Sequence, residues 1–436
     1  MSKTKIAVIG AGAIGSAIAH DLSSRGFKVS VVEKGNIIGG TSGRFHGLLH
    51  SGARYAANDI KTARESVQDN KVISRIAGHC VEDTGGLFIS LEGEDDSYKE
   101  AFLKGCAKAG IECRPVDIES LKQEEPFISK SVKSAFLVPD KVINSFRYIA
   151  SLLLTAKSEG ADVLFDTEVI DFKTAGKNVT GIRTRNVRTG KTADLKADLV
   201  INASGAWSSR LLFKSLNIRS MKTILSAGTM IVFDSRFTRY VLNRLRPPSD
   251  GDIIVPFFGQ SIVGTTSFLV NSPDKVRIDK DDIEFLKNEG SKLIPVIKNM
   301  PVHRSYSGVR ALVAQAGSDP TGRETSRDFM IFDHSKLDDM AGLLSIGGGK
   351  LSTSRLIAKD VGDHVCHIFG SKERSKTNRI QLEWPKLTND NLSKIAEKTG
   401  LSDGFLREVL EETSSRTFSD MYSPAMDLII SRLLFD

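Results

Sequence analysis

The sequence predicts an α/β protein that combines a parallel sheet and a β-meander with a second domain built on a mostly antiparallel sheet. Apolar runs at 5–9 and 29–32 flank a glycine-rich turn and a helical stretch, which is the order of elements in a βαβ unit. Between 163 and 196, apolar and polar residues alternate and are broken by glycine-containing turns, the pattern of a β-meander. Two later strand-like runs, 224–233 and 252–266, indicate the antiparallel sheet.

The first turn has the spacing G-x-G-x-x-G over Gly10–Gly15 (GAGAIG). At these positions Gly10 allows a tight turn, Gly12 lets the backbone approach a pyrophosphate, and Gly15 lets a helix pack on the strand. The helix that follows offers N–H groups and partial positive charge to phosphates. Glu33 ends the second strand, where it can accept hydrogen bonds from an adenosine ribose and repel a 2′-phosphate. We therefore predict a Rossmann-type dinucleotide-binding domain.

The composition argues against several classes of protein. A length of 436 residues suggests two or three domains, and the net charge of +7 is mild and spread along the chain, so no nucleic-acid binding is expected. The same charge is compatible with anionic substrates or an anionic lipid surface. The four cysteines lack metal-ligand and redox spacings, so free thiols and no metal site are expected.

The sequence also predicts a cytoplasmic protein. No apolar run reaches the roughly 18 residues that a membrane span needs. The N-terminal apolar run is expected to be the first strand rather than part of a signal peptide, because Glu33 follows it too soon. Peripheral docking at the cytoplasmic face of a membrane and assembly into homo- or hetero-oligomers stay open.

The segment after Glu33 concentrates side chains suited to ligand binding. Residues 35–47 are rich in Gly, Ser and Thr, and the stretch that follows runs to residue 55. Across this region lie five polar, charged or aromatic residues, Arg44, His46, His50, Arg54 and Tyr55. A solvated loop would explain them as well, but their position directly after a nucleotide motif favours a binding loop.

Two further strand ends resemble the first turn in their use of small residues. Ala203, Ser204 and Gly205 follow the strand expected at 198–202, and small residues there let backbone pass close to a nucleotide. Gly347–Lys350 closes a strand that begins at residue 342 and leads into a helix expected over 352–369. The N-terminus of that helix can face an anion or a polarised carbonyl.

With these residues laid out, the chain resembles the FAD-dependent glycerol-3-phosphate dehydrogenases, most closely the catalytic large subunit of the anaerobic enzyme. The similar stretches are Ser42–Tyr55 (SGRFHGLLHSGARY), Val241–Pro256 (VLNRLRPPSDGDIIVP), Val263–Ser267 (VGTTS), Ser307–Val313 (SGVRALV) and Gly347–Arg355 (GGGKLSTSR). Together with the nucleotide motif they cover roughly residues 1–370. The resemblance implies bound FAD and oxidation of sn-glycerol 3-phosphate to dihydroxyacetone phosphate. Hydride would pass to flavin N5, and electrons would continue to a quinone or a partner subunit.

The resemblance also implies roles for individual residues. The substrate site falls on His50, Arg54, Tyr55, Arg310, Arg327 and Lys350. His50 is the expected base, since imidazole titrates near neutrality. Arg310 and Arg327 are expected to bind the phosphate, because a guanidinium binds two oxygens at once. Arg54 and Lys350 are expected to orient the substrate and stabilise negative charge on its oxygen and on the reduced flavin.

A larger set of residues is expected to contact FAD. All belong to the two glycine-rich corners, to the loop after Glu33, or to the strands beside them. The set is Gly10, Gly12, Ala13, Ile14, Gly15, Glu33, Lys34, Thr41, Ser42, Arg44, His46, Gly47, Leu48, Val169, Ala203, Ser204, Gly205, Trp207, Gly348, Gly349, Lys350, Leu351 and Ser352.

We expect three parts in the chain. The FAD-binding domain is discontinuous and takes residues 1–75, 145–215 and 325–370, whereas the substrate domain takes 76–144 and 216–324. Residues 371–436 are charged and are expected to form a helical tail. Further helices are expected at 16–25, 59–80, 96–109, 118–123, 145–157 and 281–294, and a loop is expected at 243–248.

The chain departs from the family pattern at a few positions. Ala311 stands where proline is common, Ala227 where lysine is usual, and Asn144 with Ser145 where an Asp-Pro pair is typical. The cysteine-rich iron–sulfur extension of the anaerobic large subunit has no counterpart in this sequence, so no cluster is expected within it.

Two other functions fit the same motifs. A dehydrogenase or oxidase of L-2-hydroxyglutarate or a related 2-hydroxy acid would use Arg310 and Arg327 to bind a carboxylate. A non-catalytic flavin-binding subunit of an electron-transfer complex would keep the motif from Gly10 to Glu33 but would need neither His50 nor Arg310.

Overall fold

A six-stranded sheet carries the glycine-rich motif at the carboxyl end of its first strand. The computed structural model describes residues 4–35, 37–313 and 329–384. The order of the sheet is β20-β21-β13-β1-β2-β9, and all of its pairs are parallel except β20 with β21. The strands are β1 (Lys5–Ile9), β2 (Lys28–Val32), β9 (Asp162–Leu164), β13 (Leu199–Asn202), β20 (Phe329–Asp333) and β21 (Leu343–Gly348).

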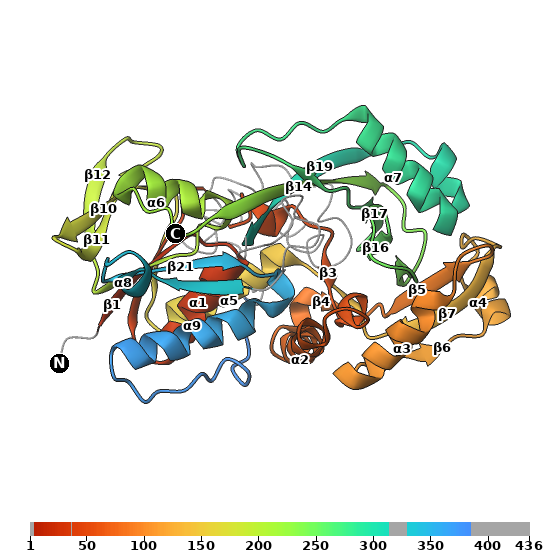
Figure 1. The fold of residues 1–436 in the computed structure, drawn as a ribbon, viewed down its shortest axis with the longest axis horizontal. Helices are drawn as coiled ribbons and strands as arrows, with labels where there is room; N and C mark the ends of the chain where they lie inside the picture. Colours follow the sequence, from red (N-terminus) through yellow and green to blue (C-terminus); the bar gives the residue numbers. More distant parts are fainter. Residues whose placement is uncertain (1–3, 36, 314–328, 385–436) are drawn as a thin grey trace, which may run out of the picture.

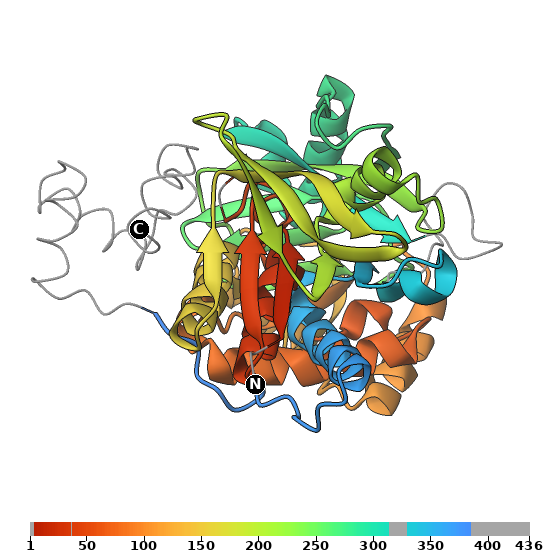
Figure 2. The same ribbon diagram turned by 90° about the vertical axis from the view of Figure 1, so that its left-hand side faces the viewer.

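Each face of this sheet is covered because alternate residues of its strands point to opposite sides. On one face, Ile6 and Val8 of β1 pack into a core with three helices, α1 (Ala13–Ser24), α5 (Ser145–Ser158) and α9 (Ser354–Ile368). On the other face, Ala7 and Ile9 pack against the meander of β10 (Thr167–Ala175), β11 (Asn178–Asn186) and β12 (Thr192–Lys196). Figure 2 shows β1 and β2 running side by side, with the yellow-green meander strands crossing them. The predicted meander is confirmed.

The second sheet is mostly antiparallel, as predicted. One of its described pairs, β15 with β5, is parallel, and the others are antiparallel. Its order is β18-β14-β17-β16-β15-β5-β7-β6, and β19 pairs with β14. The strands are β5 (Gly86–Leu91), β6 (Arg114–Pro115), β7 (Val132–Val138), β14 (Thr223–Phe233), β15 (Val241–Arg244), β16 (Ile253–Phe257), β17 (Gln260–Gly264), β18 (Phe268–Leu269) and β19 (Arg304–Val313).

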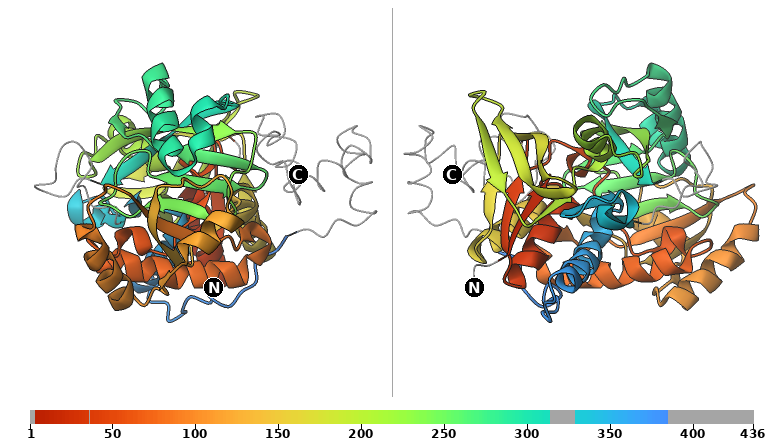
Figure 3. Two further views of the ribbon diagram at one scale, coloured as in Figure 1. Left: turned by 90° about the vertical axis from the view of Figure 1, so that its right-hand side faces the viewer. Right: turned by 60° about the vertical axis from the view of Figure 1, so that its left-hand side comes forward.

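Helices cover the second sheet and connect it to the first. They are α2 (Ile60–Ile76), α3 (Ser97–Ala109), α4 (Ile118–Glu124) and α7 (Lys280–Leu293), with α6 (Ser208–Leu216) beside the meander and the short α8 (His334–Leu337) beside β20. In the right-hand view of Figure 3 the meander and α7 lie at opposite ends of the molecule. No helix in the described part of the chain is both long and apolar enough to span a membrane.

A two-stranded ribbon and a small third sheet connect the two large sheets. Strands β14 and β19 form a long ribbon that Figure 1 shows passing from above the first sheet into the second. A three-stranded sheet of β3 (Leu48–Leu49), β8 (Lys141–Ile143) and β4 (Val81–Glu82) lies between the two halves and leads into His50. Short 3₁₀ helices occupy Thr41–Gly43, Ala53–Tyr55, Gly78–Cys80, Gly205–Trp207, Pro295–Asn299 and Leu351–Thr353.

Some local predictions differ from the structure. The loop expected at 243–248 begins inside β15, because Asn243 pairs with Ile253 and with Phe88 on its two sides. The helix expected over 59–80 ends at Ile76. Within the predicted tail, residues 371–384 contain a turn but no helix, and residues 385–436 lie outside the described part of the chain.

Candidate active site

A cavity of about 1060 Å³ lies at the carboxyl ends of β1, β13 and β21. Carboxyl ends of parallel strands meet at one edge of a sheet, which is where α/β proteins bind ligands. The cavity slightly exceeds the usual upper limit of about 1,000 Å³ for ligand pockets. Its wall includes residues 10 and 12–14, residues 203–207 and residues 348–352. The three strand ends singled out in the sequence therefore share one space.

The glycine-rich turn after β1 is in contact with both of the other strand ends. A Cβ atom at Gly349 would lie 2.9 Å from Ile14 Cδ1, and a Cβ at Gly10 would lie 2.8 Å from the carbonyl oxygen of Ala203. Both glycines have positive φ, +85° and +99°, a conformation that side chains other than glycine rarely adopt. A larger residue at either corner would occupy space that the backbone needs.

The first turn of α1 faces the cavity with its backbone N–H groups. Ala13 N donates to Ser42 Oγ at 3.0 Å, and Gly12, at the N-cap position, has no side chain to cap the helix. The N–H groups of a helix's first turn and the helix dipole make this end a site for phosphate oxygens. Ser42, from the loop after β2, places a hydroxyl beside them.

Glu33 lies at the end of β2 with its carboxylate held by the backbone. Its two oxygens accept hydrogen bonds from Ala11 N and Gly35 N, both at 2.9 Å. Burial raises the pKa of Glu33, and the backbone hydrogen bonds from Ala11 and Gly35, together with the charge and backbone of Lys34, oppose that shift. A carboxylate has about four acceptor positions, so further positions are available for ribose hydroxyls.

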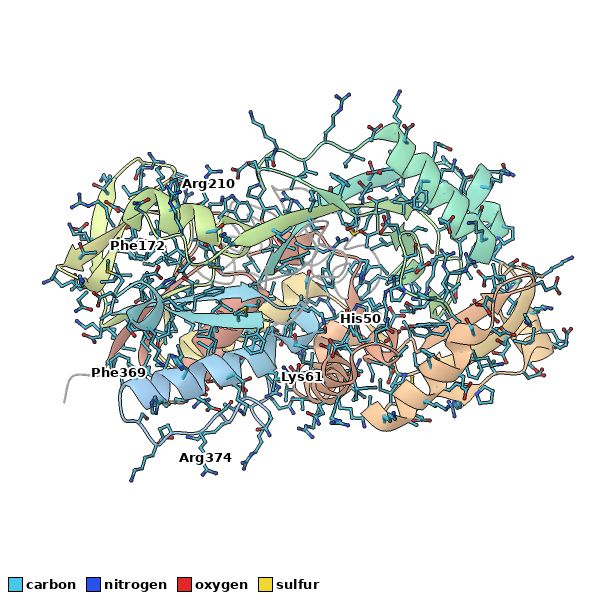
Figure 4. The ribbon with its side chains drawn as sticks, in the orientation of Figure 1. His50, Lys61, Phe172, Arg210, Phe369 and Arg374 are labelled. Carbon is cyan, nitrogen blue, oxygen red and sulfur yellow. The ribbon has the colours of Figure 1, made fainter. Side chains whose placement is uncertain are left out.

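At another part of the cavity wall, His50, Tyr55 and Lys350 form one group. The Lys350 ammonium lies 3.9 Å from the centre of the Tyr55 ring, and the Tyr55 and His50 rings are 5.6 Å apart. His46 meets His50 edge to face, with 5.7 Å between the rings. In Figure 4 His50 lies where the two halves of the molecule meet, well apart from Arg210, which also lines the cavity. The cavity is therefore elongated.

Arg310 lines the same cavity from β19. Its Nη1 donates to Ser226 Oγ at 3.2 Å and to Ser267 Oγ at 3.3 Å. Its Nη2 donates to Thr265 Oγ1 at 2.7 Å and to the carbonyl of Thr266 at 3.1 Å. These four hydrogen bonds fix the position of the guanidinium at the cavity wall. A Cβ atom at the neighbouring Gly228 would lie 2.4 Å from Nη2, so glycine is required there.

The ribbon that carries Arg310 also contacts the loop after Glu33. Thr41 Oγ1 donates to the carbonyl of Val309 at 2.6 Å, and the Tyr306 hydroxyl donates to the carbonyl of Phe45 at 2.9 Å. A Cβ atom at Gly308 would lie 2.1 Å from the carbonyl oxygen of Arg44. The loop and the ribbon are thus packed backbone against backbone.

Comparison with known proteins identifies the family. Residues 5–363 match the family model described as FAD dependent oxidoreductase. The chain belongs to this family. It is 40% identical over 380 residues to one subunit of the anaerobic glycerol-3-phosphate dehydrogenase of Escherichia coli (strain K12), covering 86% of this chain and 69% of that protein. It is 38% identical over 385 residues to the corresponding subunit from Haloferax volcanii, covering 85% and 65%.

Solved structures share the fold. A glycerol-3-phosphate dehydrogenase from Bacillus halodurans complexed with FAD has a TM-score of 0.68 and 22% identity, covering 94% of this chain and 75% of that one. An L-proline dehydrogenase from P. horikoshii has a TM-score of 0.69 and 20% identity, covering 85% and 95%. The predicted family, fold class and cofactor are confirmed, so this flavoprotein uses FAD.

The residues of the cavity fit FAD. Backbone N–H groups of α1 and the close approach allowed by Gly10 suit a pyrophosphate, and Glu33 suits a ribose. Of the predicted cofactor set, all line the cavity except Gly15 and Gly47. Gly15 instead lets α1 pack on β1, since a Cβ there would lie 1.9 Å from the carbonyl oxygen of Gly10. A Cβ at Gly47 would lie 2.5 Å from the Phe257 ring.

The structure places one predicted substrate residue of this flavoprotein away from the cavity. The Arg54 guanidinium donates to Asp252 Oδ2 at 3.3 Å and to the carbonyl of Ser249 at 3.2 Å. Asp252 is fully buried and also pairs with Arg246, so it requires positive charge around it. Arg54 does not line the cavity, whereas His50, Tyr55, Arg310 and Lys350 do. Arg327 lies outside the described residues.

Sequence reasoning missed a contact that closes one side of the cavity. Trp207 Nε1 donates to Asp274 Oδ1 at 2.7 Å, and Arg210 pairs with Asp274 Oδ2 at 2.5 Å. The Lys34 ammonium lies 4.0 Å from the centre of the Trp207 ring. Asp274 belongs to the segment between β18 and α7, and no local pattern in the sequence connects it with Trp207.

Proposed function

We propose that this flavoprotein oxidises sn-glycerol 3-phosphate to dihydroxyacetone phosphate. The observation that carries the proposal is that Arg310 and Lys350 line one cavity with His50, so a phosphate site and a base share one space. The names of its relatives at 38–40% identity support the same substrate. Arg310, held by three hydroxyls and a carbonyl, is the group we assign to the phosphate, together with Arg327.

When bound, FAD would supply the acceptor for the hydride of the carbinol carbon. His50 takes the proton of the substrate hydroxyl, which an imidazole can do near neutral pH. Lys350 lies against the Tyr55 ring, next to His50, where its positive charge stabilises the negative charge that develops on the substrate oxygen. The Tyr55 ring contacts both of these groups.

We propose that the electrons then leave to a quinone or to a partner subunit, in the cytoplasm at the face of a membrane. The support for a partner is that the names of the relatives describe each of them as one subunit of an anaerobic dehydrogenase. The net charge of +7 is compatible with an anionic membrane surface.

Anaerobic titration of the bound flavin tests the substrate. We expect sn-glycerol 3-phosphate to bleach the flavin absorbance, glycerol to bleach it far more slowly, and inorganic phosphate to compete. Bleaching by L-2-hydroxyglutarate and not by sn-glycerol 3-phosphate would reject the proposal in favour of a 2-hydroxy acid dehydrogenase. Unchanged electron flow in a flavin-containing His50→Ala variant would instead indicate a non-catalytic flavin subunit.

A further inference from the structure

Helix α2 carries two neighbouring buried polar residues that no step of the proposed reaction uses. Asp69 is fully buried and Asn70 is 2% exposed. Successive residues of a helix point about 100° apart, so these two side chains reach different segments. One holds the segment that carries Lys350, and the other holds the segment that carries His50.

Asp69 fixes the beginning of α9. Its Oδ1 accepts hydrogen bonds from Arg355 Nε, at 2.8 Å, and from Arg355 Nη2, and its Oδ2 accepts one from Leu356 N at 3.0 Å. Leu356 is in the first turn of α9, where N–H groups have no acceptor within the helix. A carboxylate from α2 therefore caps α9, four residues after the corner that presents Lys350, with one short 3₁₀ turn between them.

Asn70 fixes the strand that leads to His50. Its Nδ2 donates to the carbonyl of Leu49 at 3.0 Å and to the carbonyl of Pro139 at 3.3 Å. On the other side of His50, Ser51 N donates to Asp140 Oδ1 at 2.7 Å, and Asp140 is buried as well. Both neighbours of His50 are thus held by buried polar side chains.

We propose that Asp69 and Asn70 are positioning residues that set the spacing between His50 and Lys350. His50 and Lys350 are 300 positions apart in the sequence. Helix α2 is hydrogen-bonded to the backbone of the segment that carries each of them. Since the inference concerns how these groups work together, it rests on the proposed function. Small displacements of reacting groups cost rate rather than binding, and an error of about 1 Å can lower a rate by about 10²-fold.

A matched control lies elsewhere on the same core. Asp21 of α1 and Arg25, which follows the last residue of that helix, also form a buried carboxylate–guanidinium pair, at 2.6 Å between Oδ2 and Nε. Asp21 holds Ser375, and neither Asp21 nor Arg25 lines the cavity. Arg25 also contacts α9, but at Lys359 and Asp363, beyond the helix start that Asp69 caps. Asp21→Asn therefore reports the cost of weakening a buried ion pair away from the segments that carry His50 and Lys350.

The experiment compares Asp69→Asn and Asp21→Asn in the full chain with FAD bound. We expect Asp69→Asn to lower kcat tenfold to a hundredfold with KM changed by less than about threefold. Asp21→Asn should leave kcat unchanged, although its Tm should fall by about as much as that of Asp69→Asn. The flavin reduction potential of Asp69→Asn should become more negative, since Lys350 no longer holds its place. Hydrogen exchange should accelerate at residues 350–356 in that variant alone.

Several outcomes would overturn the inference. Equal losses of kcat in the two variants, or an unchanged potential together with unchanged exchange at 350–356, would make Asp69 a structural residue only. If Asp69→Asn does not fold, Asn70→Ser provides the same comparison from the His50 side, with faster exchange expected at 48–51. Failure of the wild type to oxidise sn-glycerol 3-phosphate would contradict the proposed function, while the potential and the exchange rates would still decide the role of Asp69.

Discussion

The nucleotide end of the cavity and the substrate end are built in different ways. Around Gly10 and Gly349 the ligand meets backbone, because glycine removes the side chains that would fill the space. Around His50 and Arg310 it meets side chains that come from separate segments and depend on polar neighbours for their orientation. The first end is specified within short stretches of sequence, whereas the second exists only after the two sheets have come together.

Replacing Gly10 by valine should have the largest effect, because it disrupts the nucleotide end of the cavity. The residue has φ +99°, and its new Cβ would lie 2.8 Å from the Ala203 carbonyl. We expect the purified variant to contain no flavin, measured as flavin absorbance per chain. Gly26→Ala is the control, because Gly26 has φ +88° but no atom within 4 Å of an added Cβ. That change should cost about 1–2 kcal/mol of stability, the cost of a side chain in the left-handed conformation, and should keep the flavin. Equal flavin content in both variants would contradict the view that FAD binding depends on the close approach of backbone at Gly10.

Replacing Arg310 by glutamine should break the substrate end alone. Hydrogen bonds to a charged group contribute about 1.5–3 kcal/mol each, so we expect kcat/KM for sn-glycerol 3-phosphate to fall about 10²-fold or more. Steady-state kinetics and the flavin content of the same preparation measure the two ends separately. Loss of flavin in Arg310→Gln would show that the nucleotide end depends on a residue of the substrate end, contrary to this comparison.

Replacing Arg54 by glutamine, compared with Arg310→Gln, tests whether Arg54 belongs to the substrate end. Arg54 pairs with Asp252 instead of lining the cavity. We expect KM to change by less than about threefold and the free energy of unfolding to fall by about 1–3 kcal/mol, the usual cost of a lost hydrogen bond to a buried charged group. A KM raised as far as in Arg310→Gln would place Arg54 on the substrate after all.

Glu33→Gln should have a moderate effect on the nucleotide end, and one that depends on pH. Burial raises the pKa of Glu33 above its ordinary value of 4.5, so the folded apoprotein retains the proton longer than the unfolded chain does. The stability that the folded apoprotein gains from the proton on Glu33 is therefore lost as pH rises from 4.5 through the raised pKa. Apoprotein Tm measured against pH should show this slope in the wild type and a smaller one in Glu33→Gln. An identical slope would assign it to other groups.

Ser42→Ala should give the smallest effect. Ser42 Oγ accepts one hydrogen bond from the first turn of α1, and loss of such a capping contact costs about 1 kcal/mol. Calorimetry should show a small drop in Tm and a less than tenfold weaker affinity for FAD. A larger loss would mean that the hydroxyl, rather than the backbone, dominates the phosphate site.

Much of the nucleotide end can be predicted from the sequence because its signals are local. Gly10, Gly12 and Glu33 lie within one βαβ unit, whose order and spacing follow from chain geometry. The meander is visible in its period of two, since its strands pair with their sequence neighbours. The parallel pairing of β1 with β13 brings residues 203–205 to the same edge.

The substrate end can be predicted only in part. His50 and Lys350 are found through family resemblance, but the hydroxyls of Ser226, Thr265 and Ser267 that hold Arg310 are not, since separate segments supply them. The placement of Arg54 depends on Asp252, almost 200 residues away. Such pairings follow from tertiary packing, for which a single sequence has no local pattern.

The β14–β19 ribbon gives the two ends a thermodynamic connection. Its Gly308 packs against the backbone of Arg44 in the loop over the nucleotide site, Val309 accepts a hydrogen bond from Thr41 of the same loop, and the next residue is Arg310. If ordering that loop favours a single position of the ribbon, FAD and an anion must strengthen each other's affinity by the same factor. Inorganic phosphate should then slow the release of FAD from the wild type, and Arg310→Gln should abolish that protection without emptying the site.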